Sequence, residues 1–428
     1  MQTNFTLDQL SDPDIAESNA ILRACVHCGF CTATCPTYAL LGDELDSPRG
    51  RIYQIKDMLE RDIPAPVETV KHLDRCLSCL SCMTTCPSGV HYMHLVDHAR
   101  AHIEKTVRRP FMERSIRNLL ALVLPRPFIF RLALIGAFFA KPIARFLPGA
   151  LGAMFRMAPK SIAPPSYVDK PQVFSAIGKQ RGRVALMNGC AQQVLAPEIN
   201  EATVRILTRH GIEVVVVDGA GCCGALVHHM GRLNDSLRQA ARNIRAWSLE
   251  REARGLDALI VNTSGCGTMV KDYGFMFRND TALKEDAEWV SAMTKDVTEY
   301  ISTLDLPAMA PQVLRVAYHS ACSMQHGQKI TDAPIKLLSN AGFDVVSPAD
   351  GHLCCGSAGT YNILEPEIAD RLKERKVANL QATKPQVIAA GNIGCIAQIG
   401  SGTALPVIHT VELLDWVTGG QKPTRLKL

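Results

Sequence analysis

The pattern of apolar and polar residues changes from helical to alternating strand and helix in the second half of the chain. Short apolar runs, separated by longer stretches with helical patterning, lie at residues 184–190, 213–218, 258–266, 315–322, 344–348 and 387–395. Such runs are typical of buried parallel strands, and several are rich in β-branched residues. The pattern therefore predicts α/β architecture from residue 183 onward.

The N-terminal part predicts short helices instead. Residues 46–62 read as a helix that Pro48 can start, and residues 90–105 predict another. Residues 105–165 mix apolar runs with Arg, Lys and Pro, and the apolar run without a charge at residues 132–140 has only 9 residues. A helix that spans a membrane needs roughly 20 predominantly apolar residues, so we expect no span.

The chain has 16 cysteines, which fall into four groups of four. The groups are Cys25, Cys28, Cys31 and Cys35; Cys76, Cys79, Cys82 and Cys86; Cys190, Cys222, Cys223 and Cys266; and Cys322, Cys354, Cys355 and Cys395. The N-terminus is polar and lacks the apolar run of an export signal, which predicts a cytoplasmic location with reduced thiols. Grouped cysteines then indicate metal binding rather than disulfides.

The first two groups follow the same pattern, C-x2-C-x2-C-x3-C-P. In bacterial two-cluster ferredoxins, three of these cysteines hold one iron–sulfur cube and the fourth ligates the other cube. We therefore predict two [4Fe–4S] clusters with exchanged fourth ligands. One would take Cys25, Cys28, Cys31 and Cys86, and the other Cys76, Cys79, Cys82 and Cys35. Zinc on the CxxC pairs is the alternative, although zinc does not need this longer spacing.

The last two groups reveal an internal repeat. Their first three cysteines recur after 132 residues, and the fourth recurs after 129 residues. In each copy a cysteine ends the first predicted strand, a CCG tripeptide follows the next, and a cysteine ends a later strand. Because the carboxyl ends of parallel strands gather ligands, these thiols can meet at one edge of the sheet. A repeat of this length predicts two related α/β modules.

The CCG tripeptides resemble the cysteine-rich CCG domain of heterodisulfide reductases and of several subunits that serve flavoenzymes. That family's pattern closes with C-x2-C, whereas the closing positions here are Met269 and Gln398. The unusual non-cubane cluster of those enzymes is therefore in doubt. A metal or redox cofactor on four thiolates, such as a further iron–sulfur centre, remains one interpretation, and a structural or quinone-contacting role is the other.

Two further motifs favour plain interpretations. Residues 219–224 match G-x-G-x-x-G after a strand, but the second module lacks the middle glycine and keeps the CCG, so nucleotide binding is not favoured. His91, His94 and His98 lie at helical spacing, which favours a solvated helix face. His319 and His326 flank Cys322 and could tune or ligate a cluster, although simple hydrogen bonding is favoured.

Charge is concentrated between residues 105 and 160, which hold eleven Lys or Arg against one acidic residue, Glu113. The whole chain has a net charge of only +5, which does not indicate nucleic-acid binding. Arginines alternate here with Leu, Phe and Ile, notably at Arg108, Arg109, Arg114, Arg117, Arg126, Arg131, Lys141 and Arg145. The stretch suits either a membrane interface or a partner subunit.

Nearly the full length resembles the iron–sulfur subunits of bacterial glycolate oxidase. The resemblance is carried by ILRACVHCGFCTATCPTYALLGDELDSPRGRIYQIK, DRCLSCLSCMTTCPSGV, AGCCGA, SGCG, HLCCGSAGTYNILEPEIA and NIGC. It implies a complex with FAD-binding subunits that oxidise glycolate to glyoxylate and pass electrons toward quinone at the inner face of the cytoplasmic membrane. The iron–sulfur proteins of lactate utilisation and of anaerobic glycerol-3-phosphate dehydrogenase share the same cysteine pattern.

The predicted fold is thus an α+β multidomain protein. A helical two-cluster ferredoxin-like domain (1–104) precedes a basic apolar helical segment and linker (105–180) and two related CCG modules (181–310 and 311–428). No FAD or NAD is expected on this chain, which makes it a conduit for electrons from a cofactor held elsewhere. The alternative, from another class of function, is a scaffold protein in which the clusters only stabilise the fold.

Overall fold

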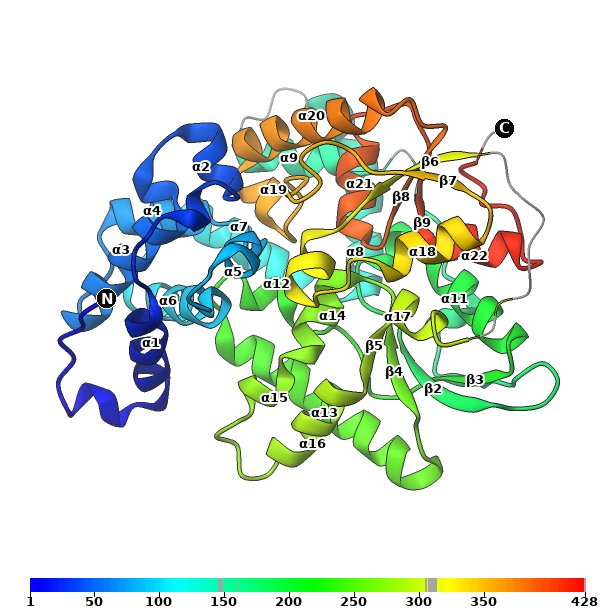
Figure 1. Cartoon of the computed structure of the whole chain (residues 1–428), viewed down its shortest axis with the longest axis horizontal. Helices are drawn as coiled ribbons and strands as arrows, with labels where there is room; N and C mark the ends of the chain where they lie inside the picture. Colours follow the sequence, from blue (N-terminus) through cyan, green and yellow to red (C-terminus); the bar gives the residue numbers. More distant parts are fainter. Residues whose placement is uncertain (145–148, 160, 305, 307–313, 427–428) are drawn as a thin grey trace.

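The computed structural model describes residues 1–144, 149–159, 161–304, 306 and 314–426. Figure 1 shows a helical N-terminal region in blue and cyan beside two sheet-containing modules, the first green and the second yellow to red. This arrangement confirms the predicted fold class. The boundary expected at residues 310–311 lies outside the described residues, and the domain limits stay predictions.

Short helices enclose the cysteine loops of the N-terminal region. α3 (Pro48–Glu60) begins as the sequence predicts, because the Ser47 hydroxyl accepts a hydrogen bond from the amide of Gly50 at 3.0 Å. The second predicted helix is α6 (Tyr92–Thr106), and the two pack together through Ile55 and Leu95. The remaining elements are η1 (Gln9–Ser11), α1 (Pro13–Ala24), η2 (Phe30–Thr32), α2 (Pro36–Leu41), η3 (Glu44–Asp46), α4 (Val67–Asp74) and α5 (Ser81–Thr85).

The first module is a five-stranded sheet in the order β1-β3-β2-β4-β5. Its strands are β1 (Gln172–Phe174), β2 (Gly182–Met187), β3 (Ile212–Val216), β4 (Ala258–Val261) and β5 (Thr294–Asp296). Neighbouring strands are parallel except β1, which pairs antiparallel with β3. Its helices are α10 (Gln192–Leu195), α11 (Glu198–Arg209), α12 (Ala225–His228), α13 (Leu233–Arg254), α14 (Ser264–Lys271), α15 (Tyr273–Met276), α16 (Lys284–Met293) and α17 (Val297–Ile301).

The second module repeats this design with a parallel sheet in the order β7-β6-β8-β9. Its strands are β6 (Arg315–His319), β7 (Asp344–Val346), β8 (Val387–Ala390) and β9 (Val407–His409). Its helical elements are η5 (Ser323–Gly327), α18 (Ala333–Asn340), α19 (Tyr361–Leu364), α20 (Pro366–Ala382), α21 (Ile393–Gly400) and α22 (Thr410–Val417). Val184 pairs with Ala258 in the first sheet and Val316 with Val387 in the second, so the register repeats with the spacing of the cysteines.

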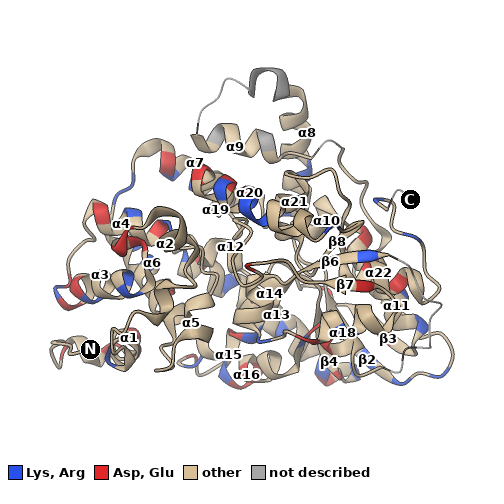
Figure 2. Cartoon of the chain, turned by 45° about the horizontal axis from the view of Figure 1, so that its top comes forward, with Lys and Arg blue, Asp and Glu red and all other residues tan. Residues whose placement is uncertain are grey.

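Three helices join the N-terminal region to the first sheet. They are α7 (Phe111–Val123), α8 (Pro127–Ala144) and α9 (Gly149–Met157), and a short turn, η4 (Tyr167–Asp169), follows them. In Figure 2, α8 and α9 stand at the top of the view. Across the described ranges, every helix is too short or too polar to cross a membrane.

The N-terminal region contacts both modules. On the first module, Asp14 accepts a hydrogen bond from Arg278 at 2.6 Å. On the second, the Tyr361 hydroxyl donates to the carbonyl of Arg75 at 3.0 Å, and Thr84 Oγ1 lies 2.8 Å from His326 Nδ1. Since Thr84 and Arg75 flank the second cysteine run, the second module lies directly against that run.

Candidate metal centres

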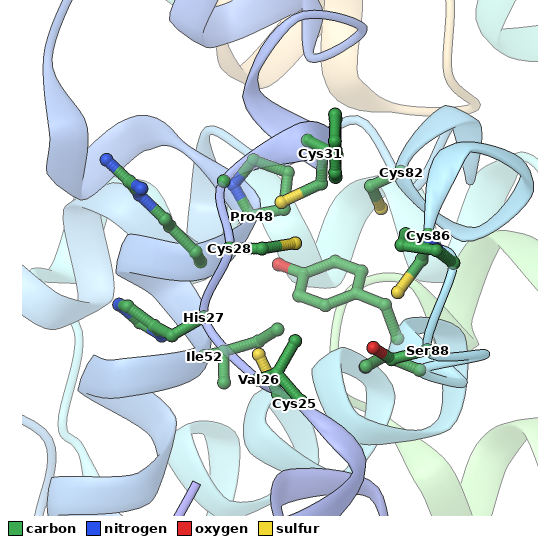
Figure 3. A pocket seen from close by; sticks show the side chains of 16 residues that line it. Cys25, Val26, His27, Cys28, Cys31, Pro48, Ile52, Cys82, Cys86 and Ser88 are labelled. Carbon is green, nitrogen blue, oxygen red and sulfur yellow. The ribbon is translucent and has the colours of Figure 1, made fainter.

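The structure brings Cys86 to the first three cysteines of the other run. Cys25, Cys28, Cys31 and Cys86 line one hollow, together with Cys82 (Figure 3). In Figure 3 these labelled cysteine side chains lie around one space, and Tyr92 also lines the hollow. This is the first of the two quartets that the exchanged-ligand pattern predicts.

The two cysteine loops share an unusual backbone conformation. His27 and Gly29 have φ values of 58° and 87° in the first loop, and the equivalent Ser78 and Leu80 have φ values of 48° and 62° in the second. Left-handed residues between successive cysteines curl the chain, so that its thiols can face one centre. Leu80 accepts this strained conformation although it is not glycine, and its side chain is buried.

The thiols of the second run and Cys35 lie close to one another. Burial raises the pKa of Cys82 first, and the charges of Cys79, Cys76, Cys35 and Cys31 raise it further, so all of these thiols lie within electrostatic range. Cys35 also raises the pKa of Cys31, so it lies near both runs. The ligand assignments themselves stay predictions.

A buried ion-pair network supports Cys35. Asp46, which is 0% exposed, receives hydrogen bonds from Arg51 Nη2 at 3.1 Å and Arg75 Nη1 at 2.9 Å. Arg51 also lies 3.9 Å from the Cys35 sulfur, and Thr37 donates to the backbone carbonyl of Asp46 at 2.8 Å. Sequence reasoning missed this network, although its signal is present in the DSPRGR run at the start of α3.

Two residues of α6 fix the second loop. Arg100 Nη2 donates to the carbonyl of Cys76 at 2.6 Å, and Arg100 Nη1 donates to Ser78 Oγ at 2.6 Å. The Tyr92 hydroxyl lies 3.8 Å from the Cys76 sulfur. Because one helix holds both the loop backbone and a cysteine, the position of Cys76 follows the position of α6.

The donor sets fit iron–sulfur clusters. Each predicted quartet contains four thiols, which is the ligand set of a [4Fe–4S] cube. Burial raises the pKa of Cys31 to about 11, which favours the neutral thiol. A metal cation reverses that preference, because a coordinating thiol is deprotonated outright.

The thiols of each CCG group also lie close together, and their role as ligands stays a prediction. In the first module, Cys222 and Cys190 have their sulfurs 3.5 Å apart, and hydrogen bonds with Cys222 and then Cys266 raise the pKa of Cys223. In the second, the sulfurs of Cys322 and Cys354 are 3.8 Å apart. Cys355 exchanges hydrogen bonds with Cys354 and Cys395, so this quartet is also continuous.

The glycine of each CCG allows close helix packing. Gly224 and Gly356 have φ values of 90° and 88°, a region that side chains disfavour. A Cβ atom on Gly356 would lie 2.5 Å from the carbonyl of Ala369 in α20, and one on Gly224 would lie 2.9 Å from Ser236 in α13. The tripeptide therefore needs glycine to place its two thiols against the following helix.

The second CCG quartet adjoins the second ferredoxin-type site. Leu77, Cys79, Cys354 and Tyr361 belong to one buried apolar cluster, and Cys322 packs against it. Burial, and then the charge of Cys322, raises the pKa of Cys79. The thiols of two different domains thus share one interior from which water is excluded.

The histidines do not all behave as the sequence suggests. The expectation of a solvated face on α6 is wrong, because His94 Nε2 lies 2.9 Å from Asp272 Oδ1 in the first module and His98 Nδ1 lies 2.6 Å from Ser18 Oγ. His326 contacts Thr84 and the carbonyl of His352, in keeping with its predicted hydrogen-bonding role. The equivalent prediction for His319 is not met, since neither ring nitrogen has a partner.

The G-x-G-x-x-G run forms hydrogen bonds within the protein. The amide of Gly221 donates to Asn243 Oδ1 at 2.7 Å, and Asn243 Nδ2 donates to the carbonyl of Cys222 at 2.9 Å. The helix that follows, α12, has only 4 residues. The run therefore lacks the helix opening that a nucleotide loop requires.

The basic segment uses some of its arginines internally. Arg109 and Arg117 are buried, where both pair with Asp74 and Glu113. Arg131 donates to the carbonyls of Ala163 and Gln193. Arg108, Arg114 and Arg126 are exposed, and Arg145 lies outside the described residues.

Two known protein families match these regions of the chain. Residues 21–90 match the family described as "4Fe-4S dicluster domain", and residues 184–271 and 316–400 each match the "Cysteine-rich domain" called CCG. The chain is therefore an iron–sulfur protein in which a dicluster domain is joined to two cysteine-rich domains. The predicted cofactors, two [4Fe–4S] clusters, are confirmed at this level.

Full-length relatives define the family more narrowly. The chain is 41% identical over 416 residues to the "Glycolate oxidase iron-sulfur subunit" of Escherichia coli (strain K12), covering 97% of this chain and 98% of that one. It is 32% identical to the "Probable glycolate oxidase iron-sulfur subunit" of Bacillus subtilis (strain 168), over 92% and 93% of the two chains. The chain belongs to the family of glycolate oxidase iron–sulfur subunits, as the resemblance predicted. It is an electron-transfer component of an oxidoreductase.

Two more distant matches are partial. "Lactate utilization protein A" of Bacillus licheniformis is 28% identical but covers 54% of this chain. A solved structure, a hypothetical protein from Helicobacter pylori, superposes with a TM-score of 0.52 at 10% identity, over 97% of this chain and 74% of that chain. The latter likeness concerns the fold alone.

Proposed function

We propose that this chain carries electrons from an FAD-binding partner, which oxidises glycolate to glyoxylate, toward a quinone-type acceptor. The observation that carries the proposal is the full-length similarity to glycolate oxidase iron–sulfur subunits, with all sixteen cysteines gathered into four quartets. Lactate-utilisation proteins offer the second candidate, but their similarity spans only about half of the chain, 54%.

The residues of this chain hold the cysteines in place, exclude water between the sites and supply a fixed charge. Iron–sulfur clusters, when bound, accept and release single electrons at potentials set by their surroundings. Arg51, a buried cation beside Cys35, supplies a fixed positive charge at the second site. Leu77 and Tyr361 share a buried apolar cluster with Cys79 and Cys354, which gives electrons a path through a dry interior from that site to the second CCG module.

Copurification with a flavoprotein, followed by substrate assays, tests the proposal. We expect the complex to reduce a quinone analogue with glycolate, more slowly or not at all with D-lactate, and not with glycerol 3-phosphate. Omission of this chain should abolish quinone reduction while glycolate still reduces the flavin. A preference for another of these substrates would contradict the glycolate assignment. Clusters that dithionite reduces but a quinone analogue cannot re-oxidise would favour the scaffold alternative.

We also propose that the complex meets the inner face of the cytoplasmic membrane through α8. Phe128, Leu132, Ile135 and Phe139 follow one another at helical spacing, and their exposed fractions are 74%, 52%, 46% and 77%. Exposed Arg108, Arg114 and Arg126 are nearby in sequence and can attract anionic headgroups. An apolar stripe flanked by arginine suits a helix that lies in a bilayer interface.

Vesicle flotation tests this contact. Replacing both Phe128 and Phe139 by serine should weaken binding to phosphatidylglycerol-containing vesicles about tenfold or more, because each buried aromatic ring contributes about 1.5–3 kcal/mol. Val67 and Leu249 are exposed by 80% and 67% outside this stripe, so serine at both positions provides the control. Equal flotation of both double variants, or no flotation of the unaltered protein, would refute the contact.

A further inference from the structure

We propose that the second CCG module holds a metal centre to which His319 contributes a nitrogen ligand, alongside the thiolates of Cys355 and Cys395. The first module has no equivalent ligand. The proposal concerns the second module alone, and the proposed function does not depend on its outcome.

His319 is a buried histidine without a partner inside the protein. It ends β6, its exposed fraction is 1%, and neither Nδ1 nor Nε2 forms a hydrogen bond. Buried side-chain polar atoms are paired in the large majority of cases, and an unpaired one costs about 1–3 kcal/mol. Two orphaned nitrogens on one ring therefore indicate a missing partner.

Two cysteines converge on the same point. One ring nitrogen of His319 and the sulfurs of Cys355 and Cys395 all lie within 4.8 Å of one another. All three residues are buried and come from different segments: the end of β6, the CCG loop and the first turn of α21. Ligands of one tetrahedral ion at about 2.0–2.3 Å from the metal lie about 3.5–4 Å apart, so a small adjustment closes the site.

The chemistry of these donors indicates a transition metal. A neutral imidazole keeps a lone pair that can bind a metal. Imidazole together with thiolates binds zinc or iron and disfavours calcium or magnesium. Cys354 and Cys322 complete the neighbourhood with two further sulfurs.

A buried cation balances the charge of such a site. Lys376 of α20 is 2% exposed, and its ammonium donates to the carbonyl of Asp350 at 2.8 Å. This ammonium lies within electrostatic range of Cys355, Cys354 and Cys395. Thiolates on a metal carry a net negative charge, and a lysine buried next to them stabilises it.

The repeat shows that these features belong to the second module only. Strand register aligns His319, opposite Ala390, with Met187, opposite Val261. The counterpart of Lys376 is Ile244 at a spacing of 132 residues or Trp247 at 129, and both are buried and apolar. The second module has thus gained a nitrogen donor and a buried cation where the first has apolar side chains.

Replacing His319 by methionine, the residue found at the equivalent place in the first module, tests the site in the full-length protein. We expect anaerobically purified His319→Met to lose the second-module metal while the two ferredoxin-type clusters keep their EPR signals. If the ion is zinc, metal analysis should show a fall from about one zinc per chain to near zero. If it is iron, iron should fall, and nitrogen coupling in pulsed EPR should disappear with it.

Two further variants serve as controls for this experiment. His319→Cys supplies a different ligand and should restore the metal, with the nitrogen signature still absent. Met187→Leu changes the equivalent core position and should leave metal content and spectra unaltered. The proposal is overturned if His319→Met keeps the metal content and nitrogen coupling of the unaltered protein. It is equally overturned if the unaltered protein contains no metal beyond its two ferredoxin-type clusters.

Discussion

Replacement of Asp46 by alanine is expected to destabilise the N-terminal domain by about 3–5 kcal/mol, because it leaves a buried charge without its partner. Asp46 accepts hydrogen bonds from Arg51 and Arg75, and Arg51 is 1% exposed. Arg51 cannot reach water, nor can it lose its proton at ordinary pH. The same change should loosen Cys35, which lies next to Arg51, and so release the cluster at the second site.

The measurement is the urea midpoint of the N-terminal domain, followed by the bleaching of iron–sulfur absorption, together with the iron content before unfolding. Asp57→Ala is the matched control, since Asp57 pairs with Arg61 on the surface, where their side chains are 50% and 63% exposed. Exposed pairs contribute about 0–1 kcal/mol, so this variant should keep its midpoint and its iron. Equal midpoints for the two variants would show that the buried network is not what holds the second site.

The cysteine pattern predicted the main sites because iron–sulfur ligation leaves a local signature in sequence. The x2-x2-x3 spacing indicated which thiols curl together, and the structure places Cys86 beside Cys25, Cys28 and Cys31, whereas the ligand assignment of Cys35 stays a prediction. The six apolar runs also became strands β2, β3, β4, β6, β7 and β8, since a buried parallel strand has few polar residues.

Features that depend on tertiary contacts could not be predicted in this way. β5 and β9 were not predicted; β5 has the sequence TKD, which contains no apolar residue, and β9 has only 3 residues. β1 lies in the stretch expected to be a linker, and becomes a strand because β3 offers it an edge. His94 has the same helical spacing whether it faces water or Asp272, and only the packing of the first module against α6 decides between them.

His319 shows the same limit at a candidate site. Its place beside Cys322 in sequence suggested either hydrogen bonding or metal ligation, and both interpretations were open. The structure supplies the missing facts, namely that both ring nitrogens lack partners and that Cys355 and Cys395 lie close by. Neither fact is encoded in the local sequence, because the three residues come from separate segments.

Loss of a fourth cysteine should remove one cluster and leave the other. We expect Cys35→Ser and Cys86→Ser each to lose about four irons and four acid-labile sulfides per chain, since a cube that lacks one thiolate is not retained. If Cys35 serves the second run and Cys86 the first, as the cysteine pattern predicts, each variant should empty the site formed by the opposite run.

Pairs of cysteine variants decide which thiols share a cluster, which is the central claim. If the fourth ligands are exchanged, Cys35→Ser combined with Cys76→Ser still loses about four irons, because both residues serve one site. Cys35→Ser combined with Cys25→Ser then loses about eight, because the two residues serve different sites. Iron and sulfide analysis of these two double variants, prepared anaerobically, is the most direct measurement. The reverse order of losses, or unaltered protein that holds zinc and no iron, would contradict the account.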